Sequence, residues 1–108
     1  MDFSSEEKGS ALIITINEEN LDIGNSIEFR DGLAKEAEKA KESVILDMNK
    51  VNYIDSSGLG VLITFSKFNK DSNRILKLAN CNPKVRDTMK STRLDGEIPI
   101  FDSVDAAL

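Results

Sequence analysis

The sequence predicts an α/β fold whose sheet is mixed and built partly from parallel strands. Short apolar runs alternate with helical patterns through most of the 108 residues. This alternation favours parallel strands joined by right-handed crossovers. The chain has the length of one ordinary domain, and no linker, repeat or low-complexity segment divides it. We therefore expect a single domain over residues 1–108, with four or five strands and about four helices.

The expected strands are short and mostly apolar. Residues 11–16, ALIITI, form a continuous β-branched run that is typical of a strand buried on both faces, and residues 2–7 can pair with it as an edge strand. Residues 43–48, SVILDM, and 73–80, NRILKLAN, predict two further strands. Residues 98–101, IPIF, predict a short strand near an edge, because its proline cannot donate a ladder hydrogen bond.

The first expected helix covers residues 26–43 and follows a polar loop at residues 17–26. Asn25 is the expected N-cap, and Glu28 supports the first turn in a variant of the capping box. Gly32 weakens this helix. One apolar stripe is expected to face the core: Phe29, Leu33, Ala37 and Ala40.

Two helices are expected in the last third of the chain. Residues 82–92 open with Asn82 as a cap and Pro83 at the first helical position, where the missing N–H does no harm. Residues 102–108 predict one or two closing turns, with Asp102 or Ser103 as the cap.

The composition limits the function. The net charge of −5 argues against a nucleic-acid partner or an acidic membrane surface. The chain has no histidine, so the commonest general base and zinc ligand are absent, and we expect no cofactor or metal site. Cys81 is the only cysteine, which excludes an internal disulfide. A lone thiol without a secretion signal fits the cytoplasm, and no apolar stretch is long enough to span a membrane.

The stretch YIDSSGLGVLI, residues 53–63, runs from a short connection at residues 49–55 into a helix expected over residues 56–70. It follows a buried strand, and sites in parallel sheets lie beyond the carboxyl ends of strands. The simplest interpretation is that its Asp and two Ser only cap the helix. The core stripe expected for this helix is Val61, Leu62, Phe65 and Phe68.

Three features favour a docking surface over capping alone. The two glycines in the opening turn each disfavour a helix by about 1 kcal/mol relative to alanine, which suggests that something needs room there. A helix N-terminus favours phosphate, and a phosphoserine there adds about −1.5 to −2 charges at neutral pH. A second stripe at helical spacing also begins at a hydroxyl and continues with apolar residues: Ser56, Leu59, Gly60 and Ile63.

The stretch resembles the phosphorylation segment of the STAS family, specifically of bacterial anti-sigma factor antagonists, whose pattern is Asp-Ser-Ser/Thr-Gly-Leu-Gly. The tail at residues 85–108, with its final Ser-x-x-x-Ala-Leu, is similar to that family's ending. The resemblance implies a STAS-type domain that binds an anti-sigma factor and so releases a sigma factor. It also implies that a serine-kinase anti-sigma factor phosphorylates the antagonist and that a PP2C-type phosphatase restores it.

The resemblance also implies roles for individual residues. The residue directly after the motif Asp is the one modified in the family, which here is Ser56. The family's Gly-x-Leu-Asp loop corresponds to ENLD, residues 19–22, in which Glu19 replaces the glycine and Asp22 matches. The implied partner-binding residues are Asp22, Asp55, Ser57, Gly58, Leu59, Gly60 and Ile63.

Other functions fit the residues less well. Asp22, Asp47 and Asp55 could form an acidic metal pocket like that of a phospho-aspartate receiver domain. Such a site needs a pair of acids directly after the first buried strand, and residues 11–16 are not directly followed by such a pair. The nucleophilic serine of a hydrolase needs an activating base, for which only Lys or Asp could serve in a chain without histidine, and no Gly-x-Ser-x-Gly elbow is present. We therefore expect a protein that is not an enzyme. The alternative within the same fold is a STAS scaffold or adaptor subunit of another signalling or transporter-associated complex.

Overall fold

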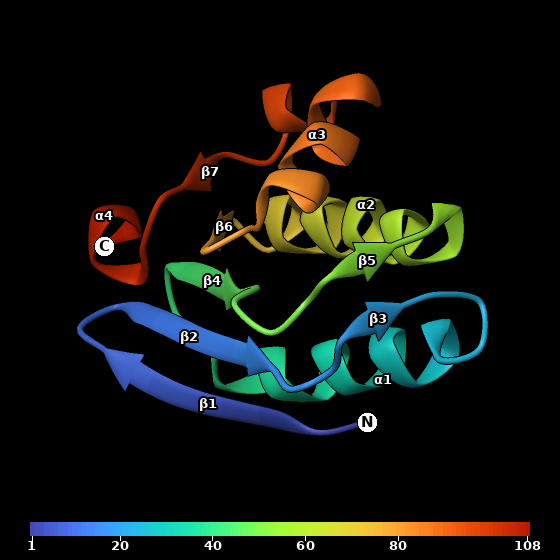
Figure 1. Cartoon of the computed structure of the whole chain (residues 1–108). Helices are drawn as coiled ribbons and strands as arrows, with labels where there is room; N and C mark the ends of the chain where they lie inside the picture. Colours follow the sequence, from blue (N-terminus) through green and yellow to red (C-terminus); the bar gives the residue numbers. More distant parts are fainter.

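The computed structural model describes residues 1–108 and confirms an α/β fold with a mixed sheet (Figure 1). The main sheet has the strand order β1-β2-β4-β6-β7. β1 is antiparallel to β2, and all other neighbouring pairs are parallel. β7, which begins directly after Pro99, is an edge strand, as predicted for residues 98–101. The strands are β1 Phe3–Lys8, β2 Ala11–Ile16, β4 Ser43–Asp47, β6 Ile75–Ala79 and β7 Ile100–Phe101.

Four helices cover the sheet, and Figure 1 shows α2 lying between α1 and α3. The alternating side chains of β2 enter two clusters: Leu12 and Ile14 pack in the large helix-side core, whereas Ile13 packs in a small cluster that contains Ala107 of α4. The predicted burial of this strand on both faces is therefore confirmed. The helices are α1 Ser26–Glu36, α2 Ser56–Asp71, α3 Pro83–Ser91 and α4 Val104–Ala107, with 3-10 turns η1 Ala37–Lys39 and η2 Leu94–Gly96.

The caps of the last two helices agree with prediction. The Asn82 side chain accepts a hydrogen bond from the backbone N of Val85 at 2.8 Å, with Pro83 at the first helical position. The Ser103 side chain accepts one from the backbone N of Ala106 at 3.0 Å. Side-chain chemistry within three residues decides both caps, and such local chemistry can be read from sequence.

The first helix differs from prediction at both ends. It is followed by the turn η1, and Ala40 is already extended with ψ of 142°, so the helical segment ends well before residue 43. Asn25 stands at the N-cap position, but its side chain makes no capping bond, and Glu28 contacts the terminal amine of Met1 instead. Gly32 has a packing role, because a Cβ there would collide with the ring of Phe3.

Two other expectations are wrong. The segments 17–26 and 49–55 are not only loops, because they contain the strands β3 Asn20–Leu21 and β5 Tyr53–Ile54, which form a small parallel sheet. Phe68 is not a core residue: its side chain is 45% exposed and lies beside Phe65 and under the guanidinium of Arg74. It sits at the margin of the buried arc of α2, where the helix meets solvent.

Candidate functional site

The candidate site lies at the N-terminal ends of α1 and α2, directly after the two strands of the small sheet. β3 follows β2 and precedes α1, while β5 follows β4 and precedes α2. The parallel pairing of Leu21 with Ile54 holds these two connections side by side (Figure 1). The starts of both helices therefore meet beyond the carboxyl ends of the central strands, which is where open α/β sheets place their sites.

Asp55 is the N-cap of α2 and also binds the loop before α1. Its Oδ1 accepts hydrogen bonds from the backbone N of Ser57 at 2.8 Å and of Gly58 at 3.0 Å. Its Oδ2 accepts a third bond, at 3.0 Å, from the backbone N of Ile23. The capping interpretation therefore holds for Asp55, whose carboxylate fixes the geometry of the site.

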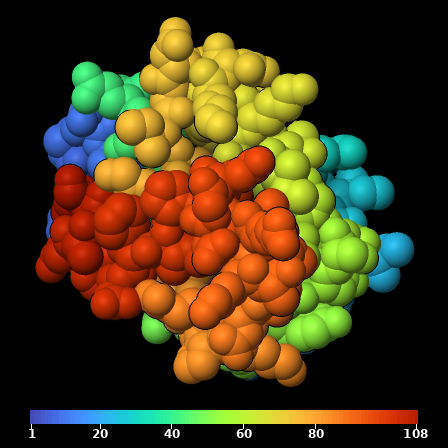
Figure 2. All heavy atoms as spheres, turned by 90° about the horizontal axis from the view of Figure 1, so that it is seen from above, coloured from blue at the N-terminus to red at the C-terminus, as the bar shows by residue number.

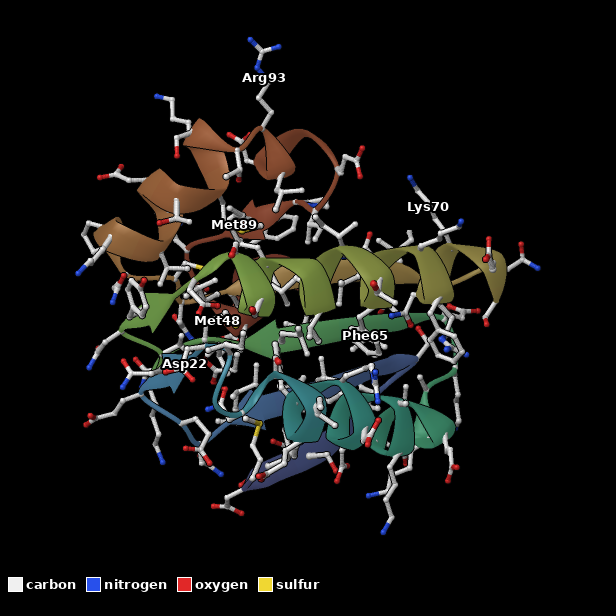
Figure 3. All side chains as sticks on the ribbon, turned by 90° about the vertical axis from the view of Figure 1, so that its right-hand side faces the viewer. Asp22, Met48, Phe65, Lys70, Met89 and Arg93 are labelled. Atoms are coloured by element: carbon white, nitrogen blue, oxygen red, sulfur yellow. The ribbon has the colours of Figure 1, made fainter.

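Asp22 belongs to a tightly bonded turn in the same loop. Its Oδ1 accepts a hydrogen bond from the backbone N of Gly24 at 2.9 Å. Asn25 closes the turn, because its Oδ1 accepts from the backbone N of Asp22 and its Nδ2 donates to the carbonyl of Asn20. This is why Asn25 does not cap α1. Asp22 lies half-buried at the end of β3 (Figure 3).

Ser56 is the first residue of α2 and is exposed. Because Asp55 supplies the cap, the Ser56 hydroxyl takes part in none of the hydrogen bonds of this turn. Ser57 is half-buried, and its backbone N is held by Asp55. The two neighbouring serines are therefore not equivalent: Ser56 presents a free hydroxyl at a helix N-terminus, a position that accommodates a phosphate group.

The two glycines of the motif have different surroundings. Gly58 is buried, and a Cβ there would lie 2.5 Å from the carbonyl oxygen of Leu21, so the close approach of β3 requires glycine. Gly60 is exposed, and a Cβ there would meet nothing within 4 Å. Packing within the fold therefore explains why residue 58 is glycine, whereas no contact within the chain requires glycine at residue 60.

The predicted second stripe of α2 is only partly exposed. Leu59 is 9% exposed and belongs to the main core, so its assignment to an exposed docking stripe is wrong. The reason is the position of α2 between α1 and α3, which buries a wider arc than one stripe. Gly60 and Ile63 remain on the surface, with Ile63 44% exposed. The exposed strip continues at helical spacing through Ser56, Gly60, Ile63 and Lys67.

Sequence reasoning missed two apolar residues at this site. Ile23 is 79% exposed and Ile27 is 64% exposed, which makes them the two most exposed large apolar side chains of the chain. Ile23 lies in the loop bound by Asp55, and Ile27 lies in the first turn of α1. Helical spacing could have identified Ile27 as exposed. It lies two residues before the buried Phe29, which is a rotation of about 200° around the helix axis.

We call the exposed set around the start of α2 the docking surface, and side chains of opposite charge lie on its two sides. Asp22 and Asp55 lie on the α1 side. On the α3 side, Tyr53 is 43% exposed and Lys84 Nζ lies 5.4 Å from its ring centroid. The docking surface consists of Asp22, Ile23, Ile27, Tyr53, Ser56, Gly60 and Ile63.

The remaining reactive side chains are used elsewhere in the fold. Asp47 does not join Asp22 and Asp55 in a pocket, because its Oδ1 accepts hydrogen bonds from the backbone N of Asn49 and from Asn80 Nδ2. Burial raises the pKa of the Cys81 thiol to about 11, which disfavours the reactive thiolate. None of the helices combines the length and apolar character needed to cross a membrane.

Comparison with known proteins assigns the family. The STAS domain model matches residues 2–107. The chain belongs to the STAS domain family. A STAS-domain-containing protein of Pseudomonas aeruginosa is 35% identical to this STAS domain over 78 residues, which cover 72% of this chain and 75% of that protein.

Two further relatives carry a functional name. BtrV of Bordetella bronchiseptica, named as a candidate anti-sigma factor antagonist, is 25% identical over 101 residues, covering 94% of this STAS domain and 87% of BtrV. The crystal structure of a candidate anti-sigma factor antagonist from Thermotoga maritima superimposes with a TM-score of 0.88 at 28% identity. That superposition covers 97% of this chain and 90% of the other.

Proposed function

We propose that this STAS domain is an anti-sigma factor antagonist that acts by reversible docking and is switched off by phosphorylation of Ser56. In the unmodified state, the docking surface binds an anti-sigma factor with serine-kinase activity, which releases a sigma factor. A PP2C-type phosphatase returns the phosphorylated form to the binding state. The proposed location is the cytoplasm, and the protein itself catalyses no reaction.

The observation that carries the proposal is the free hydroxyl of Ser56 at the head of an exposed strip. Ser56 is exposed and unbonded, whereas Ser57 is half-buried beside it. Gly60 follows on the same strip without an intramolecular reason to be glycine. A partner backbone that approaches closely at this point accounts for a residue that otherwise disfavours the helix.

The switch follows from charge at the surface. A phosphate on Ser56 adds about −1.5 to −2 charges next to the carboxylate of Asp55. The N-terminus of α2 accepts that charge without unfolding, so the fold stays intact. An interface formed over this position must then desolvate a dianion, and binding weakens through charge rather than through rearrangement.

A kinase assay with matched serine variants tests the proposal. The protein, Ser56→Ala and Ser57→Ala are each incubated with a candidate anti-sigma kinase and ATP, and the phosphate is mapped by mass spectrometry. We expect labelling of the protein and of Ser57→Ala, and none of Ser56→Ala. Labelling that persists in Ser56→Ala contradicts the assignment. Tight binding of a partner that ignores Ser56→Asp favours the adaptor function instead.

A further inference from the structure

A shallow groove runs along the second half of α2, away from Ser56. It consists of two adjoining hollows of about 180 Å³ and 160 Å³. The first is lined by Ile63, Ser66, Lys67, Lys70 and Glu97. The second shares Ser66, Lys70 and Glu97 and continues past Arg74, Ile75, Leu76 and Pro99. Residues 97–99 form the opposite wall, so the groove lies between α2 and the segment that leads into β7. Figure 2 shows these yellow and orange parts of the chain side by side on one face.

The charge of this groove is opposite to that of the whole protein. Its charged lining is three cations, Lys67, Lys70 and Arg74, against the single acid Glu97, although the chain carries a net charge of −5. Figure 3 shows Lys70 projecting from the end of α2 toward the side that carries α3. The guanidinium of Arg74 is held in place, because its Nε donates to Asn69 Oδ1 at 2.9 Å, and its Nη2 is buried without a partner.

The groove is longer than a small anion needs and has apolar ends. Ile63 and Lys70 are seven residues apart in α2, which corresponds to about 10 Å along the helix axis. An extended peptide rises about 3.3 Å per residue, so about three residues span this distance. Ile63 at one end is 44% exposed and Ile75 at the other is 57% exposed. Cations spread between two exposed isoleucines complement a segment whose acidic side chains are flanked by apolar ones.

We propose that this groove binds an acidic, partly apolar peptide segment of a protein partner in an extended conformation. The site goes beyond the proposed switch, because none of its lining residues except Ile63 belongs to the docking surface. The shared Ile63 makes the two surfaces continuous, so one partner can occupy both. The binding does not depend on the hydroxyl of Ser56.

Titration with a defined probe tests the groove without an anti-sigma factor. The probe is a capped eight-residue peptide with four central Glu residues flanked by two Leu residues at each end, added to the isotope-labelled full chain at low salt. We expect saturable amide shifts at Ser66, Lys70 and Leu76. Lys67→Gln combined with Lys70→Gln should weaken binding roughly five-fold, because each exposed charge pair contributes modestly. Glu97→Gln should tighten binding about two-fold by removing the repelling carboxylate.

Matched controls separate the groove from general attraction. Lys8→Gln combined with Lys35→Gln removes the same charge at two exposed positions of β1 and α1, and it should change the affinity less than two-fold. The titration uses no anti-sigma factor and no phosphorylated protein, so its outcome is independent of the proposed switch. The proposal is overturned by absence of saturable binding or by equal loss of affinity in the two lysine pairs. Equal shifts and affinity with inorganic phosphate alone overturn the peptide assignment.

Discussion

Asp55 holds Ile23 in place through a hydrogen bond of 3.0 Å from the backbone N of Ile23 to Asp55 Oδ2. The other carboxylate oxygen of Asp55 caps α2. One side chain therefore joins the loop before α1 to the start of α2, and it holds the backbone of the exposed Ile23 at the N-cap of α2. The motif Asp serves the fold and shapes the docking surface at the same time.

Replacement of Asp55 should loosen both elements. We expect Asp55→Ala to lower the free energy of unfolding by about 1–2 kcal/mol through loss of the cap, and to speed hydrogen exchange at the Ile23 amide. Urea unfolding and amide exchange measure these effects. Asp22→Ala is the matched control, because the Asp22 side chain accepts a hydrogen bond only from the backbone N of Gly24 within its own turn. Equal destabilisation by the two variants would contradict the bridging role.

The two glycines of α2 should respond in opposite ways to alanine. Gly58→Ala should destabilise the fold by about 1–3 kcal/mol, because its Cβ overlaps the Leu21 carbonyl. Gly60→Ala should stabilise it by about 0.5–1 kcal/mol, because the helix gains propensity and nothing is obstructed. Thermal and denaturant unfolding measure both. We also expect Gly60→Ala to weaken binding of the anti-sigma factor, and unchanged binding would show that the partner does not approach this turn closely.

The exposed isoleucines should contribute to partner binding and little to stability. Ile23→Ala and Ile27→Ala should each weaken binding of the anti-sigma factor by about ten-fold, the effect typical of an apolar anchor. Their unfolding free energies should stay within about 0.5 kcal/mol of the parent protein. Calorimetric titration measures the binding. Leu108→Ala is the control, since Leu108 is 54% exposed at the end of the chain after α4. Equal loss of affinity in all three variants would contradict a role of Ile23 and Ile27 in the interface.

Alkaline pH should destabilise the protein through Cys81. Burial raises the pKa of this thiol from 9.0 to about 11 in the folded state, so the unfolded chain releases the proton first as the pH rises. The free energy of unfolding should therefore fall between about pH 9 and pH 11, by up to about 2–3 kcal/mol from this group. Denaturant unfolding of the parent protein and of Cys81→Ala across this range isolates the effect. Identical pH profiles would contradict it.

Local chemistry made much of this fold predictable from sequence. The β-branched run of β2 forms the expected strand, and Asn82 and Ser103 cap helices through hydrogen bonds that span three residues. The Asp-Ser-Ser motif was placed correctly beyond a central strand. These features depend on residues that are close together in the chain, so they can be predicted from the sequence alone.

The errors come from packing between distant segments. β3 and β5 are two residues each, so they carry no periodic signal, and their pairing exists only because two loops run side by side. Leu59 was expected on the surface because one stripe was assigned to the core, but α2 lies between two helices and buries a wider arc. Asn25 bonds within its own loop instead of capping, a choice that depends on the turn at Asp22.

The most direct test of the account compares partner binding before and after modification of one atom. The protein phosphorylated stoichiometrically at Ser56 Oγ, with Ser57→Ala in the background, is titrated against the anti-sigma factor beside its unphosphorylated counterpart. The account predicts a loss of affinity of about a hundred-fold, since like charge and desolvation at an interface cost several kcal/mol, with an unchanged circular dichroism spectrum. Equal affinity of the two forms would contradict the account.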